Sequence, residues 1–334
     1  MIALSICIPT FERPDLLRRA LQSISDATGD ANEVEILVSD DSQDDRSARI
    51  CEAMFAQWPG RARRIENRPK LGLVGNFNRC VAAASGRHIL ILHDDDYLLP
   101  GAVAAVLLAA KATPMRHVML FGVDVVDMSG RLRRRQSFRR EIHLKPEDAL
   151  LQVISNSSYV RFPGIVVAAD AYAAVGPFDT AFGGTTDLDM WIRLFRRFGV
   201  ECLQPIISAY SVHDEAHTAG MFNPDTIASV LTIFDRVAEQ HVVPQHVLRH
   251  CEADFLAQFI LGGAYRHLRR GDRSGARKVM QLFDLPPVRS VGPSRRWWLI
   301  RLAIGALMRA PGPLDVESRL LERLYPDASI LWPR

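Results

Sequence analysis

Three consecutive aspartates, Asp94, Asp95 and Asp96, follow an apolar run at residues 89–92. The run predicts a buried strand, so the three carboxylates stand where that strand ends. Adjacent negative charges repel one another unless water solvates them or a cation binds them. Carboxylate oxygens suit Mg²⁺ or Mn²⁺, ions that also bind phosphate oxygens. An acidic triplet alone is more often a solvated loop than a metal site, so its surroundings decide between the two.

The first hundred residues alternate between strand and helix patterns. Strands are predicted at residues 4–8, 34–38, 62–66 and 89–92, with amphipathic helices between them. This order predicts an α/β fold with a doubly wound, mixed but mainly parallel sheet flanked by helices. Ligands of such sheets bind beyond the carboxyl ends of the strands. Polar segments follow three of the strands, at residues 9–13, 39–42 and 94–96, and we expect them to face one crevice.

Composition limits the class of protein. Of the 334 residues, 48% are hydrophobic and the net charge is only +3, which argues for a folded core and against a dedicated nucleic-acid partner. The five cysteines are scattered, as in a protein of the reducing cytosol. The apolar residues 2–8 lack a basic n-region and predict a strand rather than a signal peptide. No apolar run is long enough to span a bilayer, so we expect a cytoplasmic protein.

Six short motifs follow one another along the chain. They are SICIPTFERP (5–14), EILVSDDS (35–42), GLVGNFNR (72–79), HDDDYLLP (93–100), GPFD with TDLDMWIRL (176–179 and 186–194), and YSVH (210–213). In this order they resemble the inverting glycosyltransferases of family 2, which have the GT-A fold. Each motif is weak alone, but six in order are specific. The resemblance predicts a GT-A domain at residues 1–222, followed by a helical C-terminal region at residues 223–334.

The resemblance implies an enzyme of the EC 2.4 class. Such an enzyme moves a sugar from a nucleotide-diphosphate donor, here linked to UDP or dTDP, to a hydroxyl of a glycan or lipid-linked acceptor. Mn²⁺ or Mg²⁺, held by Asp96 with Asp94 and His213, would neutralise the departing diphosphate. Asp187 would take the proton of the acceptor hydroxyl as general base. Inversion would follow from one in-line displacement without a covalent intermediate.

The resemblance also implies a set of residues that bind the nucleotide sugar. Asp40 or Asp41 would accept a hydrogen bond from the nucleobase. Thr10 and Glu12 would line the base and ribose pocket, and Asp95 would reach the ribose or the water shell of the metal. The full set is Pro9, Thr10, Glu12, Arg13, Asp40, Asp41, Asn76, Asp94 and Asp95.

Two positions depart from the family pattern. Thr186 stands where the family usually has glutamate before the base, a change that either weakens acceptor binding or marks a subclass. Phe77 stands where the family often has arginine, so a contact to the donor phosphates is either missing or supplied elsewhere. The chain has no Q-x-x-R-W sequence of processive synthases, which indicates single addition, and the resemblance implies a role in cell-envelope or exopolysaccharide biosynthesis. The alternative, for which Thr186 is the only hint, is a non-catalytic nucleotide-sugar-binding protein.

Residues 295–309 form a second conspicuous segment, RRWWLIRLAIGALMR. Arginines and paired tryptophans favour the interface of a membrane, and the segment is too short to span one. A helix buried against the catalytic domain or against the partner in a homodimer is an equally good interpretation. We expect peripheral attachment to the cytoplasmic face of the membrane, where a lipid-linked acceptor is available.

Overall fold

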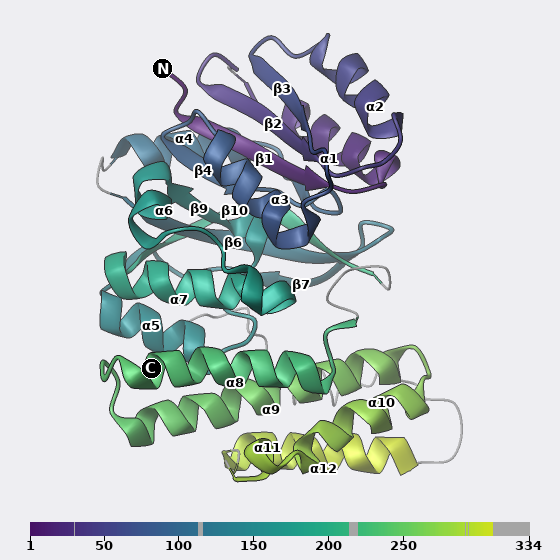
Figure 1. Cartoon of the computed structure of the whole chain (residues 1–334), viewed down its shortest axis with the longest axis vertical. Helices are drawn as coiled ribbons and strands as arrows, with labels where there is room; N and C mark the ends of the chain where they lie inside the picture. The colour runs from purple at the N-terminus through teal and green to yellow at the C-terminus, as the bar shows by residue number, and fades with distance from the viewer. Residues whose placement is uncertain (30, 113–115, 214–219, 291, 293, 310–334) are drawn as a thin grey trace. The chain divides into compact units, whose positions relative to one another are not determined.

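The structure of the chain is a computed structural model that describes residues 1–29, 31–112, 116–213, 220–290, 292 and 294–309. The described residues form two compact units (Figure 1). The first unit comprises residues 1–149 and 160–213, and the second comprises residues 150–159 together with the helices that follow residue 220. The predicted division at residue 222 stays a prediction, and residues 310–334 of the predicted C-terminal region lie outside the described part of the chain.

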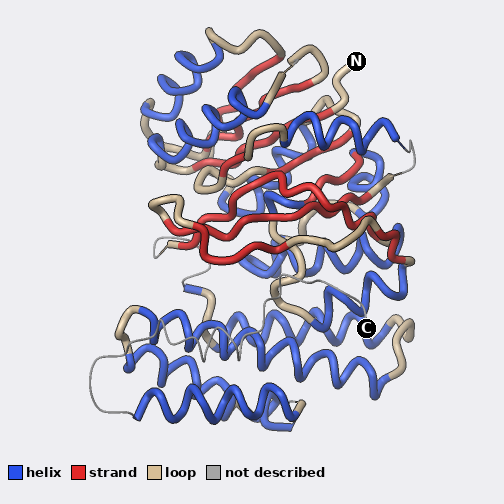
Figure 2. The backbone as a smooth tube through the Cα atoms, turned by 180° about the vertical axis from the view of Figure 1, so that it is seen from behind, coloured by secondary structure: helices blue, strands red, loops and turns tan. Residues whose placement is uncertain are grey.

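A mixed sheet runs through the first unit (Figure 2). Its order is β3 (Arg61–Glu66), β2 (Val34–Asp40), β1 (Leu4–Thr10), β4 (His88–Ile91), β9 (Ile165–Ala168), β6 (Val118–Asp127), β10 (Val200–Val212) and β5 (Tyr97–Leu98). The strands β3, β2, β1 and β4 are parallel, β9 is antiparallel to both of its neighbours, and β6 and β10 are again parallel. At the margin, β7 (Leu132–Gln136) pairs with β6, and β8 (Ile142–Leu144) pairs with β10. The predicted α/β class with a mixed sheet is confirmed.

Helices cover both faces of this sheet (Figures 1 and 2). One face carries α1 (Pro14–Ala27), α2 (Arg46–Phe55) and α4 (Ala102–Ala112), which share a core with the strands. The other face carries α3 (Gly72–Ala83), α6 (Ala169–Val175) and α7 (Thr186–Phe198). Two short 3₁₀ segments, η1 (Phe162–Gly164) and η2 (Thr180–Thr185), precede β9 and α7, and α5 (Pro146–Ser155) follows β8.

The position of β1 inside the sheet explains why its sequence is mostly apolar. Leu4, Ile6 and Ile8 belong to the core with α1 and α4, whereas the thiol of Cys7 faces α3, where it lies 3.8 Å from the carbonyl oxygen of Cys80. Because successive side chains of a strand point to opposite faces, a strand covered on both faces must be apolar at nearly every position.

The carboxyl end of β1 differs from the prediction, which ended the strand before Pro9. The strand continues through Thr10, because Pro9 pairs with Ser39 and Thr10 with Asp40 of β2. The carbonyl of Cys7 accepts from the N–H of Leu92 on the β4 side, so the ring nitrogen of Pro9, two residues later, faces that side too. There β4 has already ended, and the N–H that proline lacks is not needed.

A buried carboxylate, Glu35 of β2, ties the first strands together. It accepts hydrogen bonds from Ser5 Oγ at 2.5 Å, Ser85 N at 2.8 Å and Arg63 Nε at 3.0 Å. Ser5 Oγ in turn accepts from the N–H of Gly86 at 2.8 Å. Burial alone would raise the pKa of Glu35, but the hydrogen bonds from Ser5, Ser85 and Arg63 outweigh it and lower the pKa.

The second unit is helical. Its helices are α8 (Pro224–Glu239), α9 (Gln245–Arg269), α10 (Arg273–Met280), α11 (Pro286–Ser290) and α12 (Arg295–Arg309), with the 3₁₀ segment η4 (Gln281–Asp284). The long helix α9 contacts α8, α10 and α12. Gln258 of α9 also donates to Asn156 Oδ1 and accepts from Ser157 N, which ties residues 150–159 to this unit. No helix in the described ranges has the length and hydropathy to cross a membrane.

The Glu35 network predicts a stability effect. Glu35→Gln should lower the free energy of unfolding by about 2 kcal/mol, because the buried network loses its negative charge and an N–H₂ group replaces one of its two acceptor oxygens. The folded-state pKa of Glu35 is lowered, so its contribution is present above the unfolded value of 4.5 and fades as the pH falls. Urea unfolding at neutral and acidic pH measures both effects, with Glu52→Gln on the exposed face of α2 as control. Equal stability of the Glu35 variant and the wild type at neutral pH would contradict the network's role.

Candidate active site

The acidic triplet and the end of β1 form one cluster. Thr10 Oγ1 donates to Asp94 Oδ2 at 2.8 Å. Arg13 Nη1 lies 3.5 Å from Asp94 Oδ1 and 3.4 Å from Asp95 Oδ2. Asp94, Asp95 and Asp96 are only 5%, 9% and 0% exposed, which makes a solvated acidic loop the wrong interpretation. The parallel register of β1 with β4, continued beyond the end of β4, is what places Thr10 beside Asp94.

The end of β10 completes the cluster. His213 Nε2 lies 2.9 Å from Asp95 Oδ2, and the N–H of Ser211 donates to Asp96 Oδ1 at 2.8 Å. The second oxygen of Asp96 is buried and has no hydrogen-bond partner among the described residues. A buried carboxylate oxygen without a donor is costly, so this atom favours a bound cation.

A group with the geometry of a metal site lies here. His93, Asp95 and Asp96 each offer a ligand atom, and these atoms lie within 4.8 Å of one another. One imidazole with two carboxylates is a donor set that fits Mn²⁺. The ligands predicted from the sequence were Asp96, Asp94 and His213; that set stays a prediction and shares only Asp96 with this group.

His93 was missed by the sequence analysis, although it directly precedes the triplet. A turn begins at His93, closed by the hydrogen bond from the N–H of Asp96 to the carbonyl of His93 at 3.0 Å, and the side chain of His93 packs toward α3 whereas that of Asp94 contacts Thr10. There its ring stacks on Phe77 with centroids 5.3 Å apart, and it lies 4.5 Å from the ring of Phe162. Phe77, the position where an arginine was expected, is therefore part of an aromatic cluster.

The three carboxylates have different pKa shifts. Burial, followed by the charge of Asp95, raises the pKa of Asp94 to about 6 and that of Asp96 well above its usual range. Burial would also raise the pKa of Asp95, but the hydrogen bond from His213 and the charges of His93 and Arg13 lower it. The contacts within the protein thus stabilise the negative charge of Asp95 but not those of Asp94 and Asp96, which a cation would neutralise.

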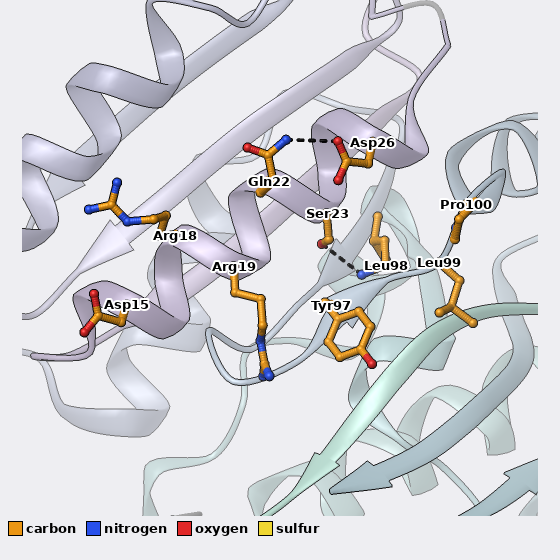
Figure 3. Close-up of a pocket in the computed structure, with 10 residues that line it drawn as sticks. All are labelled: Asp15, Arg18, Arg19, Gln22, Ser23, Asp26, Tyr97, Leu98, Leu99 and Pro100. Atoms are coloured by element: carbon orange, nitrogen blue, oxygen red, sulfur yellow. Dashed lines mark hydrogen bonds between the residues drawn. The ribbon is translucent and has the colours of Figure 1, made fainter. Parts of the chain in front are cut away.

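Arg19 of α1 supports the triplet from the other side. Its Nη2 donates to the carbonyl oxygen of Asp95 and, at 3.1 Å, to Ser211 Oγ, and its guanidinium lies 5.1 Å from the ring centre of Tyr97. Figure 3 shows both side chains at a hollow of about 550 Å³ lined by α1 and residues 97–100. None of the predicted site residues lines this hollow, so the candidate active site lies elsewhere.

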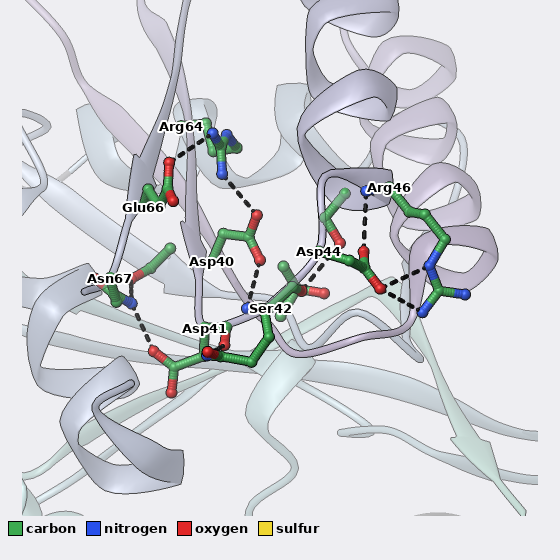
Figure 4. Close-up of polar contacts among 12 residues, drawn as sticks. Asp40, Asp41, Ser42, Asp44, Arg46, Arg64, Glu66 and Asn67 are labelled. Atoms are coloured by element: carbon green, nitrogen blue, oxygen red, sulfur yellow. Dashed lines mark hydrogen bonds and ion pairs between the residues drawn. The ribbon is translucent and has the colours of Figure 1, made fainter. Parts of the chain in front are cut away.

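The aspartates predicted to bind the nucleobase lie at the end of β2 (Figure 4). Asp41 accepts from Gly72 N at 2.8 Å, Leu71 N at 3.2 Å and Asn67 Nδ2 at 2.8 Å, so it holds the first turn of α3. Asp40 accepts from Ser42 N at 3.0 Å and from Arg64 Nη1 at 2.8 Å. A carboxylate has about four acceptor sites, which leaves Asp40 the greater capacity for a ligand N–H.

The other predicted nucleotide residues surround the same strand ends. Glu12 has a positive φ of 54°, and its N–H donates to Ser42 Oγ at 2.8 Å, which turns the exposed chain from β1 into α1. Asn76 is buried, donates to the carbonyl of Thr10 at 3.3 Å and accepts from Asn67 at 3.3 Å. Asn76 thus positions the end of β1. The assigned roles of all nine residues stay predictions.

Asp187 lies in the first turn of α7. It is half-buried, the N–H of Leu188 donates to its Oδ1 at 2.8 Å, and burial raises its pKa to about 6. Trp191 is four residues further on and therefore shares its side of the helix. The Trp191 ring lies 5.2 Å from Phe162, which in turn lies 4.5 Å from His93. Packed rings thus connect the helix of the predicted base to the metal-binding group.

The start of the loop before α7 is held by two residues, Asn78 and Arg193, that the sequence analysis did not single out. The amide of Asn78 on α3 exchanges two hydrogen bonds with the backbone of Phe178, at 2.9 and 2.8 Å. Arg193 of α7 donates to the carbonyls of Val175 at 2.7 Å and Pro177 at 2.9 Å. Thr186, found in place of the expected glutamate, is buried and donates to the carbonyl of Asp179 at 3.0 Å, so it anchors the start of α7.

Comparison with known proteins agrees with this geometry. The model of the glycosyl transferase family 2 matches residues 5–167. The uncharacterized protein MT1568 of Mycobacterium tuberculosis is 30% identical over 242 residues, which cover 70% of this chain and 73% of that protein. A Campylobacter jejuni enzyme named GalNAc(5)-diNAcBac-PP-undecaprenol beta-1,3-glucosyltransferase is 26% identical over 199 residues, 59% of this chain and 60% of the enzyme.

Solved structures show the same fold at low sequence identity. S. aureus TarS 1–349 in complex with UDP-GlcNAc has a TM-score of 0.61 and 14% identity, with 97% of this chain and 91% of that chain covered. The match covers only 53% of the longer TarS chain. The mannosyltransferase PcManGT of Pyrobaculum calidifontis, in complex with GDP-Man and Mn²⁺, has a TM-score of 0.56 and 15% identity, with 98% and 85% covered.

The fold is therefore GT-A, and together with the strand-end site and the family match it defines a glycosyltransferase that uses a nucleotide-sugar donor. The chain belongs to glycosyltransferase family 2.

Asp96 provides a test of the metal-binding group. Asp96→Asn should raise the melting temperature of the metal-free protein by about 3 °C, because a buried charge beside two others is removed while the bond from Ser211 N is kept. The advantage should grow with pH, since a raised folded-state pKa makes the wild type lose stability as the pH rises. Added Mn²⁺ should stabilise the wild type and not the variant. A destabilised variant that still responds to Mn²⁺ would exclude Asp96 as a ligand.

Proposed function

We propose that this protein is an inverting glycosyltransferase that transfers a sugar from a UDP- or dTDP-linked donor to a hydroxyl of a glycan or lipid-linked acceptor. It adds a single sugar and serves cell-envelope or exopolysaccharide biosynthesis. The observation that carries the proposal is the buried carboxylate cluster at the ends of β1, β4 and β10, linked through packed rings to the helix of Asp187.

Donor binding is assigned to the strand ends. Asp40 accepts the N–H of the nucleobase, and Thr10, Glu12 and Arg13 border the base, ribose and phosphates. Asp96, with His93 and Asp95 or with Asp94 and His213, holds Mn²⁺ or Mg²⁺. When bound, the ion acts as a Lewis acid on the diphosphate. The mannosyltransferase that holds Mn²⁺ with GDP-Man supports this assignment as a relative of the same fold.

The transfer step is assigned to Asp187. A carboxyl with a pKa of about 6 is mostly ionised at neutral pH and is still basic enough to take a proton in the transition state. It accepts the proton of the acceptor hydroxyl as that oxygen attacks the anomeric carbon. The bond to the diphosphate breaks on the opposite side of the carbon, so the configuration inverts.

The acceptor side is assigned to the membrane surface. In α12, Trp297, Ile300 and Ile304 are buried, whereas Trp298 and Leu302 are 52% exposed. The helix has arginines at 295, 296, 301 and 309 and no acidic residue, a charge that complements an anionic bilayer. We propose peripheral attachment to the cytoplasmic face of the membrane. The Campylobacter relative, named for an undecaprenol-linked substrate, supports an acceptor of this kind.

Asp187→Asn tests the enzymatic proposal. We expect sugar transfer to fall by about 10²–10⁴-fold, because the acceptor hydroxyl loses its base, while donor affinity stays within about twofold. Steady-state transfer and calorimetric titration of the donor measure the two quantities. The control is Asp170→Asn, an exposed aspartate of α6. Unchanged turnover would remove Asp187 as base, and donor binding without any transfer by the wild type would favour the non-catalytic alternative.

Vesicle binding tests the role of α12. The double variant Trp298→Glu, Leu302→Glu should reduce partitioning onto phosphatidylglycerol vesicles by at least about tenfold, because apolar contacts are lost and negative charge is added. Co-sedimentation with anionic and neutral vesicles measures it, and Leu108→Glu, at an exposed leucine of α4, is the control. No binding by the wild type would contradict the proposal. If the wild type is a dimer and the double variant is a monomer, this face of α12 would instead form the contact between two copies of the chain.

A further inference from the structure

Arg161 is an arginine of this region for which the described residues supply no hydrogen-bond acceptor. It precedes η1, and its guanidinium lies 4.8 Å from the ring centre of Tyr210 on β10. Its Nε is buried and has no hydrogen-bond partner among the described residues. None of the side-chain hydrogen bonds or ion pairs between described residues involves this guanidinium. The ring of Tyr210 therefore orients a planar group of five N–H donors that lacks an acceptor.

Three other arginines around the site have acceptors within the protein. Arg13 lies against Asp94 and Asp95, and Arg19 donates to the carbonyl of Asp95 and to Ser211. Arg64 donates to the carboxylate of Asp40. Each of these side chains compensates a charge or positions a loop, so none offers a complete guanidinium to a ligand. Arg161 differs because an aromatic face, which needs no N–H donor, holds it in place.

The position of Arg161 lies between the two halves of the proposed reaction. Its chain neighbour Phe162 is in ring contact with His93 of the metal-binding group. Tyr210 directly precedes Ser211, whose N–H holds Asp96. On the other side, the positive charge of Arg161 acts on Asp187. The guanidinium thus lies close enough to Asp187 to act on its charge and next in the chain to a ring that contacts His93, and its own positive charge would attract a ligand with negative oxygens.

We propose that Arg161 binds the diphosphate of the nucleotide-sugar donor; this inference rests on the proposed function. As the acceptor oxygen forms its bond to the anomeric carbon, its proton passes to Asp187. The bond from that carbon to the diphosphate oxygen breaks, and its electron pair stays on the leaving nucleoside diphosphate. The N–H groups of Arg161 donate to the oxygens on which this charge develops. Arginine suits the task because its fork matches two phosphate oxygens at once.

The test compares Arg161→Met, which keeps the apolar stem over Tyr210, with Arg161→Lys, which keeps the charge but not the fork. Calorimetric titration with inorganic pyrophosphate and with UDP, both in the presence of Mn²⁺, measures diphosphate affinity independently of the sugar. We expect Arg161→Met to weaken both ligands by about 10–100-fold, Arg161→Lys to weaken them less, and uridine to bind all variants equally. Arg139→Met, at an exposed arginine outside the site, is the control, and thermal unfolding checks that each variant is folded.

Unchanged pyrophosphate and UDP affinity in folded Arg161→Met would overturn the inference, and so would a loss confined to the KM of the acceptor. The proposed function fails in a different way. In that case the wild type binds pyrophosphate in the presence of Mn²⁺ but transfers no sugar from any nucleotide donor, and the Arg161→Met variant no longer binds pyrophosphate. Arg161 would then remain a diphosphate-binding residue, and the assigned reaction would be wrong.

Discussion

The constraint on which the site depends is the burial of three adjacent carboxylates at the end of β4. A bare cluster of this kind is unfavourable, because like charges repel and burial removes the water that would solvate them. Segments distant in sequence reduce this cost through hydrogen bonds and ion pairs to the triplet. They are Thr10 and Arg13 near the end of β1, Arg19 of α1, and Ser211 with His213 at the end of β10. These contacts still leave the pKa values of Asp94 and Asp96 raised. The remaining negative charge is what the proposed cation, bound together with the diphosphate of the donor, would neutralise.

The sheet topology makes this arrangement possible. Parallel pairing of β1 with β2 and β4 brings three strand ends to one edge, and β10 reaches the triplet through Ser211 and His213. The turn at residues 93–96 then separates two side chains, since Asp94 contacts the end of β1 while His93 contacts the aromatic rings around Phe162. Those rings pack against Trp191 and so connect the metal-binding group to the helix of Asp187. One strand end therefore contacts both the proposed donor side, through Asp94, and the proposed acceptor side, through the rings next to His93.

Much of the fold was predictable because it depends on local pattern. The apolar runs predicted the first four long strands, and the prediction for β1 stopped two residues early, before Pro9 and Thr10. The strand-end clustering of Thr10, Asp40 and Asp94 followed from the parallel topology. Partnerships across long sequence distances were not predictable. The network of Glu35, the capping of α3 by Asp41 and the clamp of Asn78 on Phe178 all depend on residues with no shared motif. His93 was adjacent to the triplet, but which face it meets is a tertiary property.

The central claim is that the buried carboxylate cluster and the ends of β1 and β2 bind a nucleoside diphosphate through a divalent cation. A thermal-shift panel of UDP, dTDP and GDP, each with and without Mn²⁺, tests it most directly, because a ligand that binds only the folded state raises the melting temperature by mass action. The account predicts a shift with UDP or dTDP that requires Mn²⁺. No shift with any nucleoside diphosphate in the presence of Mn²⁺ would contradict it.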